Sequence, residues 1–444
     1  MRFSNRFLNF KVESLFITFF KLKSFSVIHS KNIIFYENIN IEHNNGGKRM
    51  VKPLQGIRVL DLGHVLSMPT CTMQLASLGA EVIKIERPGL GDDARRFGPF
   101  INGESGYFIS INCNKKSITL DLKKEKGKDI FKELVKKVDI VTENFRPGTM
   151  AKMGLDYENL KKINHGIIYA SISGFGHKSV DKKRPGYDII AQAVGGIMAI
   201  TGYPDSPPTR TGFSAADIFS GTFSTIGILA ALRYRDITGE GQSIDISMMD
   251  SAVSVLENAL VRYTSTGILP TRIGSQHPSI TPFDVFETRD GWVVIAIGND
   301  SLWKKFCKAA NLEILLENPN YSTNEKRTES YQQLKPIISK WTKNISSESI
   351  ISQLNEAGIP VGNVNNVEDI IHDPNIKLRD MLVDIEHPVA GKMTIVNSPI
   401  KLSKSENVDV SPAPLLGEHT TDVLKTILGL SQENIDKLKK EQIV

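Results

Sequence analysis

Short β-branched runs alternate with helical patterns from residue 57 onward, and this alternation limits the fold more than any other feature of the chain. The first strand, helix and second strand are expected at residues 57–62 (IRVLDL), 70–78 and 81–86 (EVIKIE). A helix and two strands follow at 126–138, 139–144 (DIVTEN) and 166–173 (GIIYASIS). Strands that alternate with helices in this way favour an α/β fold with a parallel, doubly wound sheet.

The second half of the chain contains two long helical patterns and then changes character. The helices are expected over 215–234 and 248–263, with a strand, QSIDIS, between them. Glycine and proline then recur over 267–282 and indicate a linker. The strand WVVIAI at 292–297 and the helices after it predict a smaller α/β domain.

Charge, cysteine and glycine usage disfavour several classes of partner. The net charge of +5 is small for 444 residues, and no basic block is interleaved with aromatic residues, which disfavours nucleic acid. The three cysteines lie far apart without metal-ligand spacing, so neither a disulfide framework nor a metal site is expected. Glu86 stands where dinucleotide-binding folds have a ribose-binding acid, but the first strand leads into LGHVLSMP, which lacks the glycine fingerprint of NAD and FAD sites.

The first fifty residues differ from the rest of the chain. They open with MRFSNRFLNFKVESLFITFFKLKSF, where five basic residues are opposed by one acid, Glu13. A basic, aromatic and amphipathic opening predicts a mitochondrial presequence at 1–50 and a location in the matrix. The alternatives are a secretory signal and a plain extension of a cytoplasmic protein. The apolar run at 15–20 is too short to span a membrane, so no membrane partner is expected.

Two acidic residues lie close together in TGYPDSPPTRTGFSAADIFSG, at 201–221. Asp205 stands among prolines, which fix the backbone dihedral φ and remove amide donors, so the loop can present a carboxylate on a stiff turn. Asp217 lies at the start of the helix expected from residue 215, where the helix dipole favours an acid. From these residues alone, Asp205 is either a reactive carboxylate or a residue that stabilises the turn.

Seven stretches, in order along the chain, together resemble the family III CoA-transferases. This family includes formyl-CoA and carnitine CoA-transferases and the alpha-methylacyl-CoA racemases. The stretches are GIRVLDLGHVLSMPTCTMQLASLGAEVIKIERPGLGD, NCNKKSITLDL, ENFRPGTMAKMGL, ISGFG, RPGYDIIAQAVGG, TGEGQSIDISMMD and PLLGEHT. The resemblance extends from Leu54 to the carboxyl terminus and leaves residues 1–50 outside.

The resemblance implies a Rossmann-like large domain built from both ends of the chain, with a smaller α/β domain between them. The large domain is then expected over 51–266 and 391–444, and the linker with the smaller domain over 267–390. Members of the family form interlocked homodimers in which each subunit is threaded by the other, so a homodimer is expected. The expected substrates are a coenzyme A thioester and a carboxylic acid, without a tightly bound cofactor or metal.

The resemblance also assigns roles to individual residues. Asp205, in GYPDSPP, is assigned as the nucleophilic aspartate of the transferases. Contacts with coenzyme A are assigned to His64, Val65, Arg87, Leu120, Asn144, Phe145 and Lys152. Lys152 stands where some relatives have arginine and Ser173 where some have lysine, so the contacts with the CoA phosphates depart from the family pattern there.

An aspartate can perform CoA transfer without a separate base. Its reference pKa of about 3.9 keeps it ionised at neutral pH, and the carbonyl of a thioester is electrophilic. Attack by Asp205 is expected to give a mixed anhydride and CoA thiolate, after which CoA is passed to the acceptor acid. Loops and a dimer interface that exclude water would make this weak nucleophile effective.

Two other functions compete with CoA transfer. A racemase of the same family uses a histidine and an aspartate, which fall on Tyr187, just before Asp188, and on Asp217. Tyrosine, with a reference pKa of about 10, is a poor acid or base at neutral pH, which favours the transferase and leaves Asp217 and Asp188 with structural roles. A CoA-binding protein without catalysis is the second alternative.

The substrates are expected to be dicarboxylates, because GDDARRFGPF and GSQHPSITPFDVFETRDG are most similar to family members that move CoA between succinate and glutarate. A second, free carboxylate needs a cation. The candidates are Arg95, as first choice, and Arg96, Arg184 and Arg210. Residues 273–277 replace the glycine run of oxalate-using relatives, and His277 among them either orients a substrate or is an ordinary loop histidine.

Overall fold

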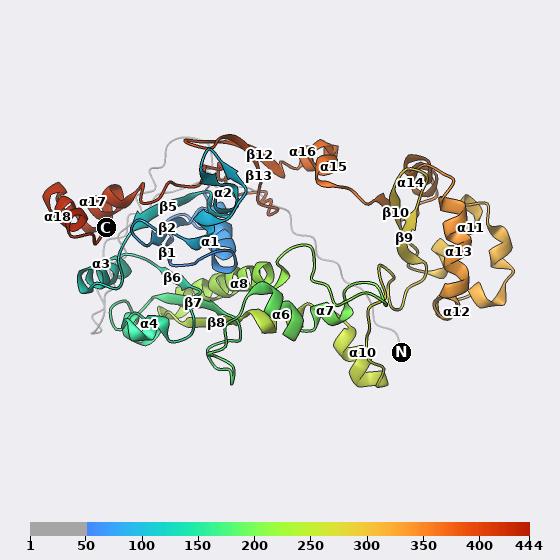
Figure 1. Cartoon of the computed structure of the whole chain (residues 1–444), viewed down its shortest axis with the longest axis horizontal. Coiled ribbons are helices and arrows are strands. Elements are labelled where there is room, and N and C mark those ends of the chain that lie inside the picture. Colours follow the sequence, from blue (N-terminus) through green and yellow to red (C-terminus); the bar gives the residue numbers. More distant parts are fainter. Residues whose placement is uncertain (1–50) are drawn as a thin grey trace, which may run out of the picture. The chain divides into compact units, whose positions relative to one another are not determined.

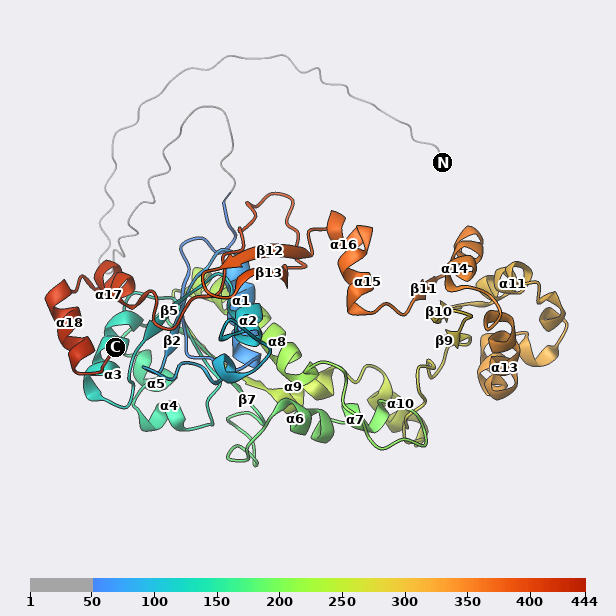
Figure 2. The ribbon, with the colours of Figure 1, turned by 45° about the horizontal axis from the view of Figure 1, so that its top comes forward.

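The structure is a computed structural model that describes residues 51–444. Figures 1 and 2 show the ribbon from two directions. The predicted presequence, at 1–50, lies outside the described residues, so mitochondrial targeting stays a prediction.

A six-stranded sheet in the order β5-β2-β1-β6-β7-β8 is the centre of the larger part of the chain. Its strands are β1 (Arg58–Asp61), β2 (Glu81–Glu86), β5 (Lys115–Thr119), β6 (Ile140–Glu143), β7 (Ile168–Ser173) and β8 (Ser243–Ser247). All neighbouring strands run parallel. The chain builds outward from β1 on one side and then on the other, which confirms the predicted doubly wound α/β class.

Helices cover both faces of this sheet (Figure 1). One face carries α1 (Ser67–Ser77), α8 (Ala215–Thr238) and α9 (Met248–Ser254), and the other carries α3 (Glu125–Val135), α17 (Thr420–Leu428) and α18 (Gln432–Lys440). Alternate residues of a strand point to opposite faces, so Val59 belongs to the first core and Leu60 to the second. Burial on both faces explains why these strands are apolar throughout.

Among the described helices, α8 is the one that is long and apolar enough to cross a membrane by length and composition. Half of its most apolar window is buried, and Ile228 and Leu232 belong to the core that α8 shares with α1 and the sheet. A Cβ on Gly221 of α8 would lie 2.5 Å from the Ser67 carbonyl oxygen, so α8 and the start of α1 approach closely. These contacts are typical of a buried core helix.

A second core lies within residues 286–361 and does not share residues with the large sheet. It is built on an antiparallel sheet of β9 (Phe283–Glu287), β10 (Trp292–Ala296) and β11 (Val361–Asn363). Helices α11 (Asp300–Ala309), α12 (Asn324–Glu329), α13 (Tyr331–Thr342) and α14 (Ser347–Glu356) accompany this sheet. Buried Arg327 connects them, since it donates to the Thr281 carbonyl and to Asp300.

A third small core joins segments that are far apart in the sequence. The hairpin of β12 (Leu382–His387) and β13 (Gly391–Val396) packs through Ile385 and Ile395 against Phe108 and Ile109 of α2 (Gly106–Asn112). The remaining elements are short: β3 (Phe100–Ile101), β4 (Glu104–Ser105), α4 (Thr149–Lys152), α5 (Tyr157–Leu160), α6 (Asp188–Val194), α7 (Ile197–Ile200), α10 (Ala259–Thr266), α15 (Val367–His372) and α16 (Pro374–Leu378).

Two predicted elements differ from the structure. The helix expected over 248–263 is wrong, because it is divided into α9 and α10 at residues 255–258, where Glu257 has a positive φ of 51°. A non-glycine residue in this left-handed region interrupts a helix. The strand β5 is absent from the prediction, and α8 extends to Thr238, where Gly239 (φ 77°) caps it.

Candidate active site

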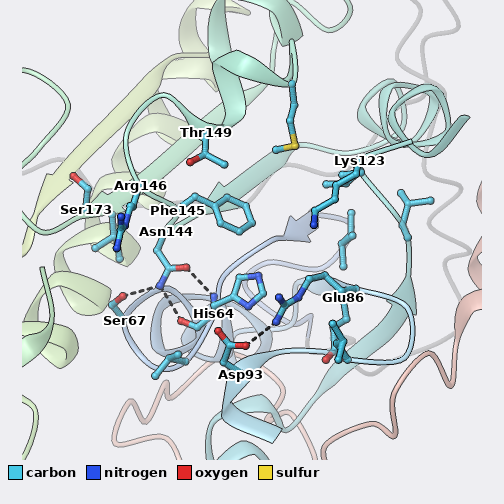
Figure 3. Close-up of a pocket in the computed structure, with 18 of the residues that line it drawn as sticks. His64, Ser67, Glu86, Asp93, Lys123, Asn144, Phe145, Arg146, Thr149 and Ser173 are labelled. Carbon is cyan, nitrogen blue, oxygen red and sulfur yellow. Dashed lines mark hydrogen bonds and ion pairs between the residues drawn. The ribbon is translucent and has the colours of Figure 1, made fainter. Parts of the chain in front are cut away.

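A pocket of about 1080 Å³ opens at the carboxyl ends of the sheet strands (Figure 3). Its residues follow one strand after another: His64 after β1, Arg87 after β2, Leu120 after β5, Asn144 after β6 and Ser173 at the end of β7. The chain reverses its direction of winding between β1 and β6, and open α/β sheets bind ligands at such a switch point. The pocket therefore lies where this topology favours a nucleotide-like ligand.

The structure brings six of the seven predicted CoA contacts to this one pocket. They are His64, Val65, Arg87, Leu120, Asn144 and Phe145. The seventh, Lys152, is exposed at the end of α4 and is not among the pocket residues. Ser173, the other departure from the family pattern, does line the pocket.

The Asn144 side chain connects the ends of β1 and β6 (Figure 3). Its Oδ1 accepts from the His64 backbone N–H at 2.8 Å, and its Nδ2 donates to the His64 carbonyl at 2.8 Å and to Ser67 Oγ at 3.0 Å. The Phe145 ring lies 5.2 Å from the His64 ring. These contacts fix the backbone of the turn after β1, which forms one wall of the pocket.

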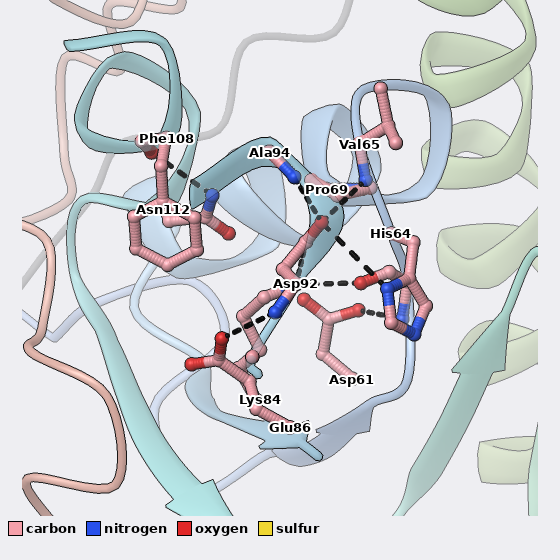
Figure 4. Close-up of polar contacts among 12 residues, drawn as sticks. Asp61, His64, Val65, Pro69, Lys84, Glu86, Asp92, Ala94, Phe108 and Asn112 are labelled. Atoms are coloured by element: carbon pink, nitrogen blue, oxygen red, sulfur yellow. Dashed lines mark hydrogen bonds and ion pairs between the residues drawn. The ribbon is translucent and has the colours of Figure 1, made fainter. Parts of the chain in front are cut away.

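Asp92 holds the same turn from the other side (Figure 4). Its Oδ1 accepts from the Val65 backbone N–H at 3.0 Å, and its Oδ2 lies 2.8 Å from the buried ammonium of Lys84. Lys84 also donates to the Gly63 carbonyl at 2.6 Å. Val65 has a φ of 62°, which is costly for a β-branched residue, so this turn depends on the contacts that surround it.

The charges in this contact are stable at physiological pH. Burial alone would raise the pKa of Asp92, but the Lys84 ammonium and His64 outweigh burial and hold that pKa well below its usual range. Asp92 is therefore an ionised acceptor, which is the form that the Val65 N–H and the Lys84 ammonium require. The pair is a positioning element beneath the pocket.

Glu143, the last residue of β6, is held by contacts that also orient the pocket residues after it. Its Oε2 accepts from the Phe145 backbone N–H at 2.7 Å, and its Oε1 accepts from the Tyr169 hydroxyl at 3.3 Å. Burial raises the pKa of Glu143 to about 8, although these two hydrogen bonds oppose the rise. Glu143 is therefore largely protonated and neutral at pH 7.

Several cations that the sequence reasoning missed line the pocket. The guanidinium of Arg87 donates to Asp93 Oδ1 at 2.7 Å and to the Gly91 carbonyl, so part of its hydrogen-bonding capacity is already used within the chain. The additional basic residues that line the pocket are Lys123, Lys124, Arg146 and Lys439. Lys123 and Lys124 follow β5 directly, so recognition of that strand would have indicated them. Lys439 gave no local signal, because it comes from a helix more than 300 residues away from Lys124.

The α18 segment completes the pocket through contacts with the loop after β5. The Ile443 carbonyl accepts from the Asp121 backbone N–H at 2.8 Å, and Lys124 donates to the carbonyls of Glu441 and Gln442 at 2.9 and 3.1 Å. Ile443 is buried in the core beneath α3. Lys439, Gln442 and Val444 consequently line the pocket.

One carboxyl group, that of Asp217, lies in the pocket wall, and a second, that of Asp188, lies beside it outside the lining residues. Asp217, in the first turn of α8, lines the pocket together with Tyr187, and Asp188 lies directly beside them. Asp188 Oδ1 accepts from the backbone N–H groups of Ala216 and Asp217 at 2.9 and 3.4 Å, and its Oδ2 accepts from Gln192 at 2.7 Å. The start of α8 thus holds Asp188 as a hydrogen-bonded acceptor.

The two carboxyl groups differ in their protonation. Burial and the neighbouring Asp188 charge raise the pKa of Asp217 to about 7, and the Ser67 hydroxyl only partly offsets this. At neutral pH Asp217 is therefore divided between its protonated and ionised forms. The sequence assigned a structural role to both residues, and the structure adds that Asp217 lines the pocket.

Asp205 does not lie in the pocket of the described chain. It is exposed in the turn where Ser206 N–H donates to the Tyr203 carbonyl at 3.2 Å, and it is not among the residues that line the pocket. The proline-rich turn therefore has the stiffness that the sequence suggested. It does not bring the Asp205 carboxylate to the predicted CoA contacts of its own chain, so its nucleophilic role stays a prediction.

Of the four candidate arginines, Arg184 lines the pocket. The first choice, Arg95, is instead used internally, since it makes two 2.7 Å contacts with buried Glu86 and lies 3.7 Å from the centre of the Phe108 ring. Glu86 is thereby paired with Arg95, although it also lines the pocket. Arg96 and Arg210 are exposed outside the pocket.

His277 has ordinary loop contacts. Its Nδ1 accepts from the Ser279 N–H at 3.1 Å, and its ring packs 5.4 Å from the ring of Phe283. Within residues 51–444, no group of three or more acidic, histidine or cysteine side chains is arranged to hold a metal ion.

A protein-family model described as CoA-transferase family III matches residues 54–420. The chain belongs to this family. As a family III CoA-transferase it is an enzyme, and the pocket at the strand ends fits its coenzyme A thioester substrate. The match begins after the predicted presequence and includes all of the pocket residues except those of α18 and the residues after it.

Relatives and solved structures support the same family. The chain is 39% identical over 389 residues to succinyl-CoA:glutarate CoA-transferase of Mus musculus, with 87% of this chain and 89% of the relative covered. It is 41% identical over 382 residues to succinyl-CoA:mesaconate CoA-transferase of Haloarcula marismortui, with 84% and 95% covered. A crystal structure of a CAIB/BAIF family protein from Brucella suis matches with a TM-score of 0.77 and 36% identity, and covers 85% of this chain and 100% of its own.

We expect Lys439→Ala to weaken the binding of the CoA substrate without affecting chemistry. Loss of one cation from the rim should raise KM for the acyl-CoA by about threefold to tenfold and leave kcat unchanged. Steady-state kinetics with a fixed acceptor measure both constants. Lys440→Ala is the matched control, because Lys440 is exposed on the same helix outside the pocket. Equal KM values in the two variants would contradict a role for Lys439.

Proposed function

We propose that this CoA-transferase takes CoA from succinyl-CoA and passes it to a dicarboxylic acid such as glutarate. The observation that carries the proposal is the pocket itself, where Asp217 and Arg184 join the predicted CoA contacts and Asp188 lies beside Asp217. The relatives support the donor, because the mouse and Haloarcula proteins are both named as succinyl-CoA-dependent CoA-transferases. Their acceptors differ, and glutarate is favoured by the relative from Mus musculus.

The proposal assigns the second carboxylate of donor and acceptor to Arg184. This residue lines the pocket near Gly186 and Tyr187, and its guanidinium is about half exposed beside Asp181, at 3.3 Å. An exposed ion pair of this kind contributes little to stability, so the guanidinium can exchange Asp181 for a substrate carboxylate at small cost. The same exchange by Arg95 would have a high free-energy cost, because it would leave its buried partner Glu86 as an unpaired charge.

The proposed nucleophile is Asp188 in place of Asp205. Its Oδ1 accepts from two backbone N–H groups and its Oδ2 accepts from Gln192, which leaves one lone pair of Oδ2 for attack. Asp188 is buried and does not itself line the pocket, but its neighbours Tyr187 and Asp217 do. Closure of the site around bound acyl-CoA would remove water and bring the two reacting groups to near-attack distance.

The chemical steps then balance without a redox or metal cofactor. Asp188 attacks the thioester carbonyl, the C–S bond breaks, and an acyl-aspartyl anhydride and CoA thiolate form. The thiolate attacks the aspartyl carbonyl of the anhydride, which releases succinate and leaves an aspartyl-CoA thioester. The acceptor carboxylate then attacks the aspartyl-CoA thioester, which gives a new anhydride and CoA thiolate. The thiolate attacks the acceptor's carbonyl in this anhydride, which releases the new acyl-CoA and restores Asp188.

Racemisation is the second candidate function, and the site gives it less support. A proton transfer at the α-carbon needs one base and one acid on opposite sides of that carbon. Asp217 is suitable for one of these roles, but Tyr187 stands where the racemases have histidine, and it is largely exposed. The mouse and Haloarcula relatives are also named as CoA-transferases.

An acceptor screen with succinyl-CoA tests the proposed function. Glutarate should give glutaryl-CoA, with kcat/KM at least about tenfold above that of monocarboxylates of similar length, because these lack the charge that pairs with Arg184. Arg184→Gln should reduce this preference to near unity, and Arg210→Gln is the matched control outside the pocket. The proposal would be overturned if no dicarboxylate accepts CoA, or if a 2-methylacyl-CoA exchanges its α-proton in deuterated water while no acid accepts CoA.

Trapping of the acyl-enzyme distinguishes the carboxylates. After incubation with succinyl-CoA and hydroxylamine, mass spectrometry should find the modified aspartate at Asp188, and Asp188→Asn should lower kcat by about 10³-fold or more. Asp205→Asn is the parallel variant, and it should retain adduct and turnover. An adduct at Asp205 that disappears in Asp205→Asn would restore that residue as the nucleophile and refute Asp188.

We further propose that the enzyme is a homodimer. The support is a set of exposed apolar side chains that the single chain does not cover, among them Leu260 and Val261 of α10 and Ile226 and Ile237 of α8. Large apolar side chains left exposed in this number are often covered by a protein partner. The interlocked arrangement implied by the family would cover such surfaces with a second copy.

Sedimentation analysis should give twice the mass of one chain. Val261→Asp should shift the population toward monomer, because it introduces a charge into the proposed interface. Val180→Asp, a change at a fully exposed loop position, provides the control and should remain dimeric. A monomeric wild-type enzyme with full activity would exclude the homodimer.

A further inference from the structure

Asp217 has features that the transfer steps above do not use. It lies in the first turn of α8, lines the pocket, and its backbone N–H faces Asp188 Oδ1 at 3.4 Å. The Ser67 hydroxyl is close enough to stabilise its charge, and Ser67 in turn accepts from Asn144, at the end of β6. Asp217 is therefore connected both to the proposed nucleophile and to the wall that binds CoA.

Few charged groups surround Asp217 on the elements packed against it. Asp188 of α6 is the nearest charge, and it disfavours ionisation of Asp217. Tyr107 of α2 is neutral at physiological pH, because burial and then the charge of Asp217 raise its pKa to about 12. The other titratable or charged groups are the buried thiol of Cys71 on α1, the exposed Asp250 on α9 and Arg184 across the pocket.

The charge of Asp188 changes during the proposed reaction. An ionised Asp188 carries one negative charge, and its acyl anhydride carries none. When Asp188 loses its charge, the repulsion that disfavours ionisation of Asp217 is removed. Acylation of Asp188 therefore makes Asp217 a stronger acid. In the same step the C–S bond breaks and leaves a thiolate, whose charge is costly in a pocket from which water is excluded.

We propose that Asp217 is the acid and base of the transfer. It protonates the leaving CoA thiolate as Asp188 becomes acylated, and it takes the proton back when CoA returns. In the forward step, ionised Asp188, protonated Asp217 and acyl-CoA give acyl-Asp188, ionised Asp217 and CoA thiol. In the return step, ionised Asp217 removes the thiol proton while sulfur attacks the aspartyl carbonyl. The inference rests on the proposed function, with Asp188 as the nucleophile.

The proposed proton transfer keeps the charge of the carboxyl pair at one throughout acylation. Before acylation, Asp188 holds this charge and Asp217 is protonated. After acylation, Asp217 holds the negative charge and Asp188 is acylated as the anhydride. A pair that retains one charge avoids both a doubly charged and an uncharged site in a partly buried environment.

The test is the pH dependence of CoA release in a single turnover. With enzyme in excess over succinyl-CoA, the acylation rate should be highest below the pKa of Asp217, about 7, and should fall as pH rises and its proton is lost. Asp217→Asn should lower this rate by about 10²-fold and remove the fall near pH 7. Asp236→Asn, an exposed acid on the same helix, is the matched control and should keep the wild-type profile.

Ser67→Ala provides a second test that leaves Asp217 in place. The hydroxyl stabilises the ionised form, so its removal raises the pKa of Asp217, and the fall in rate should move to higher pH. A purely structural role for Ser67 would lower the rate without such a displacement. Circular dichroism and thermal unfolding of each variant identify any loss of fold.

Failure of this inference is distinguishable from failure of the proposed nucleophile. An unchanged pH profile in Asp217→Asn, with the adduct still formed at Asp188, would overturn the role of Asp217 alone. An unshifted profile in folded Ser67→Ala would also contradict it. If wild-type enzyme forms no adduct at Asp188, the nucleophile assignment fails, and the proton role fails with it.

Discussion

The buried ion pair between Lys84 and Asp92 is the contact on which the arrangement of the pocket depends. Burial alone would lower the pKa of Lys84, but Asp92, Asp61 and Glu86 together raise it, so the ammonium stays charged. Through this pair the middle of β2 holds the Gly63 carbonyl and the Val65 N–H, and hence the whole turn after β1. Removal of either partner would leave an uncompensated charge in the interior and release a backbone conformation that β-branched residues avoid.

Much of the fold could be predicted because its signals are local. Apolar runs such as residues 81–86 predict buried parallel strands, and their alternation with helices predicts how the sheet is wound. β5 escaped prediction because its sequence, KKSIT, is neither apolar nor regularly alternating. Its lysine Lys115 is nevertheless buried, where it donates to Asp61 and Thr72, and these partners, far away in the sequence, explain a charged residue there.

The pocket residues that follow strand ends could be predicted from the sequence. Those whose side-chain direction depends on loop conformation could not. His64 and Asn144 follow recognisable strands, so their convergence at one edge follows from the parallel topology. The order of preference between Asp205 and Asp217, or between Arg95 and Arg184, depends on which side chain faces the pocket. The sequence pattern around each residue does not show which side chain faces the pocket. Arg95, for example, is paired with buried Glu86, nine residues earlier in the chain.

The position of α18 has a consequence for how the enzyme matures. The wall that α18 adds to the pocket is supplied by residues beyond 431, whereas the turn that holds His64 and Asn144 is complete once β6 has formed. A chain emerging from the ribosome therefore assembles the sheet edge of its nucleotide site long before the opposite wall exists. The pocket therefore reaches its final lining only when the last residues of the chain have been synthesised and α18 has packed.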